Sequence, residues 1–302
     1  MNSFRFFLAV LTALSLPVHV QAAPAKEKVS YPTRDCGAKG GGKAFAISGF
    51  RDYPPFSWVE LDEEVYNLTK FKQYRYNGFI LDPIKSALND IHIVEIKDTI
   101  FDDYYQVQKA ILRGKTDMAF ISYYVDEAKS GADYVYPAYF GNPFVVVSRA
   151  SKKIEVNDVS GLKGMKGVVR REEEIENLIA GVLPTDTKLE AVDGAETAFR
   201  KLLSGEADFM ISSPYAVEAE ARRFKIKDKI HVDTKVLRHV QYFAAFSKLS
   251  TCRKYKKLLA QQLGERLKDK AETERNLQKY IRIWADKFAD EPPLQYTPPE
   301  GE

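Results

Sequence analysis

The chain has 302 residues, with 45 basic and 42 acidic side chains and a formal net charge of +3. A hydrophobic fraction of 45% and a charged fraction of 29% argue against a disordered or fibrous chain, and the length predicts two domains. The small net charge argues against a nucleic-acid-binding protein. Two cysteines and four histidines, without metal-ligand spacing, argue against a metal site. We therefore expect neither a metal nor a cofactor.

Residues 1–22 are predicted to be a cleaved signal peptide. Arg5 precedes an apolar run over 6–18 that is too short to span a bilayer comfortably. The sequence Val-Gln-Ala at 20–22 fits the small-x-small cleavage pattern, so Ala23 is the expected mature start. The alternative is a buried N-terminal helix. Export predicts a periplasmic protein.

An exported protein lies in an oxidising compartment, where cysteines can pair. Cys36 and Cys252 are the two cysteines of the chain. A bridge between them would close a very large loop. The sequence leaves open whether the two residues meet.

The mature chain reads as alternating short apolar runs and amphipathic stretches, which is typical of an α/β fold. Asp82 followed by Pro83 suits an N-cap and a first helical position. Four prolines follow Asp290, so we expect a loose tail over 290–302. In chain order, strands are predicted over 44–49, 91–96, 118–121, 143–148 and around 168–169, and helices from about 78 to 88 and from 102 to 112.

An internal echo links residues 110–122 with residues 200–212. Each segment has a helix end, a glycine, an aspartate three residues later and then an apolar strand that ends in serine. Ligands of open α/β sheets bind beyond the carboxyl ends of the strands. The repeated unit therefore predicts two similar lobes whose strand ends face one cleft.

From about residue 44 to residue 288, the sequence resembles the extracytoplasmic solute-binding proteins of family 3, which serve amino-acid ABC transporters. The resemblance depends on the order of its short motifs, none of which is specific alone. These are YPPFSW at 53–58, GFILDP at 78–83, LRGKTD at 112–117, YPAY at 136–139, GLKGMKGVV at 161–169, LLSGEADFMISSPY at 202–215, YFAAFSK at 242–248 and KYIRIWADKF at 279–288.

The resemblance implies a type II periplasmic binding fold, in which two α/β lobes are joined by two hinge crossovers. Lobe 1 would comprise 44–146 plus 243–289, and lobe 2 would comprise 147–242. The crossings would lie near 144–148 and 241–245. Such proteins close around a ligand by hinge motion. The implied partners are a small-molecule ligand and an ABC permease in the inner membrane, and we expect a monomer.

The residues that hold an α-amino acid in the family are altered here. The family's carboxylate-binding arginine corresponds to Lys129 when counted from Asp117, or to Ala128 when counted back from Tyr136. A lysine lacks the planar two-pronged contact of arginine. The family's ammonium-binding aspartate corresponds to Ser213, whose neutral hydroxyl cannot replace a carboxylate. We therefore expect an atypical pocket.

Aromatic side chains remain at the expected cleft, and they suit an amino-acid-like, aromatic or cationic ligand. Several of them could instead be hinge packing or surface residues. The residues that we expect to contact the ligand are Tyr53, Phe56, Trp58, Ser122, Tyr123, Tyr124, Lys129, Arg170, Arg171, Glu173, Ser212, Ser213 and Tyr215.

The main prediction is a periplasmic solute-binding protein for an ABC transporter, without enzymatic activity. One alternative is a periplasmic sensor or partner-binding subunit that does not transport. A third is an enzyme resembling cyclohexadienyl dehydratase, with Glu173 as the acid, although acidic residues here also suit a helix start. For the insertion over 61–77 we consider two alternatives: it covers the cleft, or it lies on the surface away from it.

Overall fold

The computed structural model describes residues 36–124, 131–171, 178–179 and 181–299. The strands are β1 Phe45–Ser48, β2 Asp52–Tyr53, β3 Ser57–Leu61, β4 Tyr74–Asn77, β5 Ile96–Asp98, β6 Met118–Tyr123, β7 Ala132–Tyr134, β8 Phe140–Arg149, β9 Lys166–Arg170, β10 Lys188–Val192, β11 Phe209–Ser212 and β12 Ile230–Ser247. The helices are α1 Glu63–Thr69, α2 Leu81–Asp90, α3 Tyr104–Leu112, α6 Gly194–Leu203, α7 Pro214–Arg223, α8 Lys256–Arg266 and α9 Lys270–Lys287. Short 3₁₀ helices are η1 Val159–Leu162, η3 Lys227–Lys229 and η4 Thr251–Tyr255.

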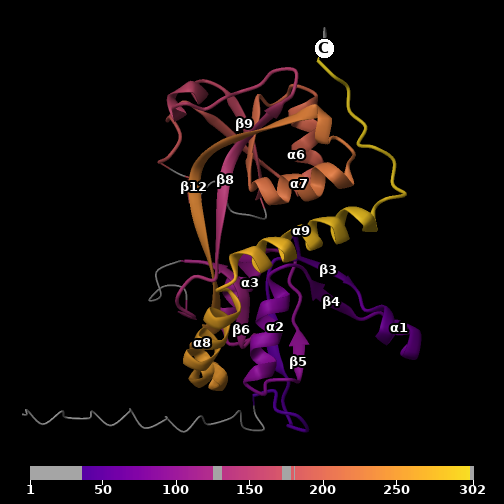
Figure 1. Cartoon of the computed structure of the whole chain (residues 1–302), viewed down its shortest axis with the longest axis vertical. Coiled ribbons are helices and arrows are strands. Elements are labelled where there is room, and N and C mark those ends of the chain that lie inside the picture. Colours follow the sequence, from indigo (N-terminus) through magenta and orange to yellow (C-terminus); the bar gives the residue numbers. More distant parts are fainter. Residues whose placement is uncertain (1–35, 125–130, 172–177, 180, 300–302) are drawn as a thin grey trace, which may run out of the picture. The chain divides into compact units, whose positions relative to one another are not determined.

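Two groups of parallel strands are joined by a pair of long antiparallel strands. In the first group β1 pairs with β5 and β6, and in the second β9 pairs with β10 and β11. Strands β8 and β12 run side by side between the two groups, and their pairing extends from Ile230↔Arg149 to Tyr242↔Phe140 (Figure 1). We call the first group, with β2, β3, β4, α2, α3 and α8, lobe 1, and the second group, with α6 and α7, lobe 2. The chain therefore has the two-lobe α/β architecture with two crossing strands.

The repeated unit of the sequence adopts the same local structure in both places. Gly114 and Gly205 both follow a helix and adopt φ values of +65° and +79°, a region that glycine enters without the steric cost of a Cβ. Three residues later, Asp117 accepts a hydrogen bond from the backbone N–H of Ala46 at 3.0 Å, and Asp208 accepts one from Lys166 at 3.0 Å. In each lobe this carboxylate therefore fixes the start of the neighbouring parallel strand.

Helix ends follow local capping chemistry, with one correction. The Asp103 side chain accepts from the N–H of Gln106 at 2.7 Å and begins α3. The prediction that Asp82 caps the preceding helix, α2, and that Pro83 opens it is wrong. Helix α2 begins at Leu81, because Leu81 N–H already donates to the Gly78 carbonyl and Ile80 has helical backbone angles.

The strand predicted over 91–96 is also wrong in its bounds, because β5 covers only Ile96–Asp98. Before it, His92 has a φ of +63°, and Val94 and Glu95 both donate to the Gly37 carbonyl. The apolar residues Ile91 and Ile93 are buried here without a strand. The apolar residues at 91 and 93 therefore indicate burial, and their interpretation as a strand is wrong.

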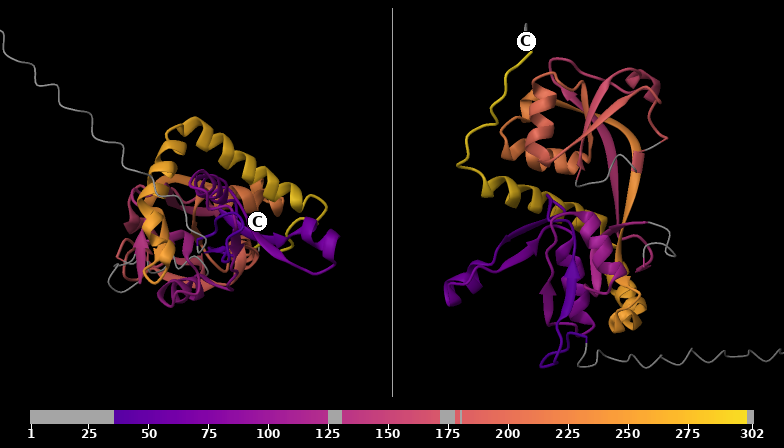
Figure 2. Two further views of the ribbon diagram at one scale, coloured as in Figure 1. Left: turned by 90° about the horizontal axis from the view of Figure 1, so that it is seen from below. Right: turned by 180° about the vertical axis from the view of Figure 1, so that it is seen from behind.

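The insertion over 61–77 forms an arm. Strands β3 and β4 pair from Trp58↔Asn77 to Leu61↔Tyr74, and α1 lies at the end of this hairpin, as both views in Figure 2 show. Asp62 caps α1, but none of the helix residues is buried. The side chains of Leu68 and Phe71 are 80% and 78% exposed. The end of the arm around α1 therefore extends the surface, whereas Tyr76 at its base is 1% exposed in the core.

The C-terminal segment packs against lobe 2, so the prediction of a loose tail is wrong for the part that the structure describes. Helix α9 lies against α7, and the tail continues past it. Leu294 donates its N–H to the Phe224 carbonyl at 3.0 Å, and its side chain is 8% exposed in the lobe 2 core. Lys225 donates to the carbonyls of Ala289 and Glu291 at 2.9 and 2.6 Å. Prolines limit regular structure but do not prevent packing.

Cys36 and Cys252 form a disulfide with Cα atoms 5.5 Å apart, and both residues are fully buried in lobe 1. The bridge ties the first described residues to η4 near the end of β12. Within the described ranges, no helix is both long and apolar enough to cross a membrane.

Candidate functional site

Four uncharged polar side chains meet where the lobes and the crossing strands converge. Asn142 of β8 donates from Nδ2 to the hydroxyls of Tyr53 at 2.9 Å and Tyr242 at 2.7 Å. Its Oδ1 accepts from Ser213 Oγ at 2.7 Å, and Tyr242 donates to Tyr53 at 3.1 Å. All four residues are fully buried. We call this group the interlobe cluster, because Tyr53 lies in lobe 1, Ser213 in lobe 2 and the other two on β8 and β12.

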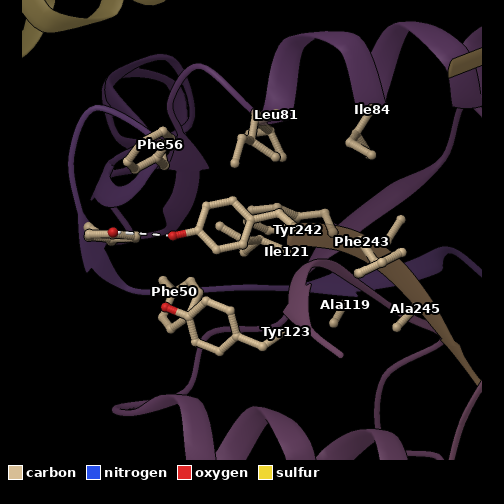
Figure 3. Packing of buried hydrophobic residues seen from close by; sticks show 14 of the residues in the cluster. Phe50, Phe56, Leu81, Ile84, Ala119, Ile121, Tyr123, Tyr242, Phe243 and Ala245 are labelled. Atoms are coloured by element: carbon tan, nitrogen blue, oxygen red, sulfur yellow. Dashed lines mark hydrogen bonds between the residues drawn. The ribbon is translucent and has the colours of Figure 1, made fainter. Parts of the chain in front are cut away.

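Aromatic rings surround the interlobe cluster. The ring of Phe56 lies 5.4 Å from Phe140 and 6.2 Å from Tyr215 of α7, so the contact joins the two lobes. Figure 3 shows the Tyr242 ring between Phe56 and Tyr123, with centroid distances of 5.8 and 5.3 Å. Such rings supply apolar walls with defined faces and edges. The rings therefore form an apolar, closely packed shell around the neutral hydroxyls.

A charged group lies beside the interlobe cluster. Arg170, at the end of β9, has a side chain only 3% exposed and donates from Nη2 to the Asp52 carbonyl at 2.7 Å and to its carboxylate at 3.3 Å. Glu220 of α7 is 2% exposed, and its Oε2 lies 3.5 Å from Arg223 Nη1. Burial raises the pKa of Glu220 to about 7, against the opposing charge of Arg170. Arg170 thus links lobe 2 to lobe 1. The raised pKa of Glu220 means that its carboxyl group titrates near neutral pH.

The structure brings together only part of the predicted set. Tyr53, Phe56, Ser213 and Tyr215 meet at the interlobe cluster, and Tyr123 packs against it. Arg170 lies at its edge, where Ser212 is buried at the end of β11 and lines a small space beside Arg170 and Glu220. The ligand-binding role of these residues stays a prediction.

Other predicted residues lie elsewhere. Trp58 packs against α9, with its ring 5.3 Å from Trp284, and donates to Glu60 at 3.2 Å. Ser122 turns toward α3 and shares a hydrogen bond of 2.6 Å with Tyr104.

Two more predicted residues are on the surface. Tyr124 is 57% exposed, and Arg171 is exposed and pairs with Asp193 at 2.8 Å. Lys129 and Glu173, the candidates for carboxylate binding and for acid catalysis, lie outside the described residues.

Asn142 is the central residue that the sequence interpretation missed. It lies in β8 just before the apolar run that begins at Pro143, and a buried amide must find partners for both donors and its acceptor. Because the predicted strand began at 143, no sequence pattern indicated that Asn142 is buried. Tyr242 lies in a recognised motif, but its hydroxyl is positioned by tertiary contacts.

The chemistry offered by the interlobe cluster is hydrogen bonding without a metal. Among the described residues, no group of three or more histidine, cysteine or acidic side chains is arranged to hold a metal ion. The cluster presents hydroxyl and amide groups, which can donate or accept, and the nearest full charges are paired. The cluster is thus an uncharged, buried group of hydrogen-bonded side chains.

No protein-family model and no curated protein matches the sequence. Solved structures do match. An amino acid ABC transporter substrate-binding protein, AbpA of Streptococcus pneumoniae bound to L-arginine, is 16% identical, with a TM-score of 0.63 over 82% of this chain and 98% of that chain. A P235GK mutant of ArgBP from T. maritima is 19% identical, with a TM-score of 0.60 over 79% and 95% of the two chains.

A third match is the ancestral amino acid-binding protein AncCDT-1, described as a precursor of cyclohexadienyl dehydratase. It is 19% identical, with a TM-score of 0.58 over 80% of this chain and 94% of that chain. At such identities the likeness establishes architecture and not ligand or activity. The TM-scores over most of both chains show that the chain has the two-lobe fold of type II periplasmic binding proteins, the fold of amino-acid ABC transporter substrate-binding proteins.

Proposed function

We propose that this chain is an exported binding protein that captures a small molecule between its two lobes and delivers it to an ABC permease of the inner membrane. The observation that carries the proposal is the interlobe cluster. Lobe 1, lobe 2 and both crossing strands each contribute a buried polar side chain to it. Side chains that come together from both lobes can contact a ligand held between the lobes, so ligand binding would favour the closed arrangement.

The chemistry of the cluster favours a ligand with a ring or apolar body and neutral polar atoms. Ser213 supplies a hydroxyl where a carboxylate would pair with an ammonium, and the nearby charge of Arg170 is committed to Asp52. The aromatic contacts of Phe56, Phe140 and Tyr215 suit a planar group. A standard zwitterionic amino acid is therefore a poorer candidate than an aromatic or uncharged analogue.

The test is a thermal-shift screen of the mature chain across polar aromatic metabolites, amino acids and sugars. A ligand at 100 times its Kd adds about 2.7 kcal/mol to stability. Ser213→Ala should reduce the shift, whereas Ser204→Ala, another lobe 2 serine whose hydroxyl bonds to groups of its own lobe, should keep it. If no compound shifts the melting of the unmutated protein, binding in the interlobe cluster is refuted.

Delivery to a permease needs a separate measurement. A tagged mature chain loaded with the active compound should retain an ABC permease from solubilised inner membranes, and the compound-free chain should retain less. Small-angle scattering should show a smaller radius of gyration on ligand addition, because the lobes move as hinged bodies. Ligand binding without permease retention would remove the transport part of the proposal.

The second candidate is a sensor or partner-binding subunit that does not transport. Direct lobe-to-lobe contacts favour it, because the Arg170–Asp52 hydrogen bonds and the packing of the C-terminal segment on lobe 2 restrain opening. Scattering curves that stay the same with and without a tightly bound ligand would support this candidate.

A further inference from the structure

A cavity of about 270 Å³ lies within lobe 1, apart from the interlobe cluster, between α3 and the sheet face where β6, β7 and β12 meet. Three of its lining residues on the sheet are alanines: Ala119, Ala132 and Ala245. Ala245 pairs with Ala119 on one side and with Tyr134 on the other, so Ala119, Ala245 and Tyr134 form a row across β6, β12 and β7. Figure 3 shows Ala119 and Ala245 close together. The alanine methyl groups project little from the sheet, so they do not fill the space between the sheet and α3.

An irregular register brings a hydroxyl to the same cavity. Strand β12 pairs Phe243 with Ser122 and Ala245 with Ala119, so β6 uses one more residue than β12 between these two pairs. Such a bulge re-aims the side chains that follow it. Ser122 therefore shares the face of Ala119, despite the odd spacing, and lines the cavity with Tyr104.

The solvent side of the cavity is formed by one stripe of α3. Tyr105, Lys109 and Leu112 all line it and recur at helical spacing, and Tyr105 and Leu112 are 55% and 51% exposed. The ammonium of Lys109 lies 4.1 Å from the centre of the Tyr105 ring. Apolar surface, an aromatic ring and a cation thus surround one opening.

We propose that this cavity, which we call the α3 pocket, binds a small aromatic acid. The ring would lie over Ala119 and Ala245, and the carboxylate would point outward to Lys109. A cavity of 150 Å³ is enough for benzene, and drug-sized pockets begin at about 300 Å³. The α3 pocket lies between these values, so it admits one ring with a short substituent. A free ammonium group on the ligand would meet the like charge of Lys109.

Phenylacetate is the probe, and benzylamine is its cationic counterpart of similar size. Titration of the mature chain, followed by backbone amide NMR, should show saturable shifts for residues of α3, β6 and β12 with phenylacetate and weaker or no shifts with benzylamine. Shifts confined to Asn142 and Ser213 would overturn the proposal, because they would place the probe in the interlobe cluster. No shifts at millimolar phenylacetate would also overturn it.

Two test variants and one control make the assignment specific. Lys109→Gln should weaken phenylacetate about three- to five-fold, the size expected for one exposed ion pair, whereas Lys115→Gln, an exposed lysine that does not line the pocket, should leave the affinity unchanged. Ala245→Leu fills the floor and should abolish binding. Since Lys109 is exposed, its variant tests the proposal even if the filled core variant does not fold. Equal affinity in Lys109→Gln and the unmutated chain would refute the assigned carboxylate contact.

Discussion

The buried carboxyl of Glu220 predicts an unusual dependence of stability on pH. A glutamate in the unfolded chain titrates near the ordinary value of 4.5, and burial in lobe 2 raises the pKa of Glu220 to about 7. Between these pH values, the folded protein binds more protons than the unfolded chain. The free energy of unfolding should therefore fall as pH rises from about 4.5 to 7, and it should level off above that range.

The size of the effect follows from the shift. A rise of between two and three pH units corresponds to about 3 kcal/mol, since each unit is about 1.4 kcal/mol. Arg170 and Arg223 act in the opposite direction, because their positive charges favour the ionised carboxylate. The sign of the measured effect therefore decides whether burial or ion pairing dominates at this position.

The assay is urea unfolding of the unmutated chain and of Glu220→Gln at pH 5 and pH 8. Glutamine preserves the size of the side chain and removes the titration, so the difference between the two proteins isolates this group. Glu220→Gln should gain stability relative to the unmutated chain by about 2–3 kcal/mol on going from pH 5 to pH 8. The reasoning is refuted if that difference is constant with pH, or if the variant loses relative stability at pH 8.

Three further substitutions test the contacts that hold the fold. Ser213→Ala leaves the buried Asn142 Oδ1 without the Ser213 donor, and it should cost about 1–3 kcal/mol in urea unfolding; a loss near zero would mean that the cluster is not well ordered. Leu294→Ala should cost about 2 kcal/mol in thermal melting and should speed proteolysis of the C-terminal segment, because it removes a side chain from the lobe 2 core. Replacing Cys36 and Cys252 together by alanine should cost about 2–5 kcal/mol, and a reducing agent should lower the melting temperature of the unmutated chain but not of the variant.

Much of the architecture was predictable, because it depends on local and repeated patterns. The helix–glycine–aspartate–strand unit occurs twice, and Asp117 and Asp208 make the same contact in each lobe. What failed depends on contacts between distant segments. The tail was expected to be loose from its prolines, but Leu294 finds a place beside Phe224 that no local pattern reveals.

The candidate site was less predictable, for a physical reason. Period-two alternation assigns the face of a strand residue only while the strand register is regular. The extra residue in β6 turns Ser122 away from the expected cleft and toward α3, so a correct strand prediction gave a wrong orientation. Trp58 was likewise assigned to a cleft wall by its motif, but α9 returns from the far end of the chain and covers it.

The interlobe cluster also constrains how a ligand would gain affinity. Its hydrogen bonds are already satisfied by its own side chains, so a ligand that inserts a polar atom replaces the Ser213–Asn142 bond and does not simply add one. Such an exchange contributes about 1 kcal/mol or less, whereas covering an aromatic ring contributes roughly 25 cal/mol for each Å² removed from water. Binding strength should therefore follow the apolar area placed against Phe56 and Tyr215, and the polar atoms should set selectivity. Among compounds with the same polar groups, an aromatic one should bind more tightly than its smaller aliphatic analogue; the reverse order would place the binding energy in the hydrogen bonds.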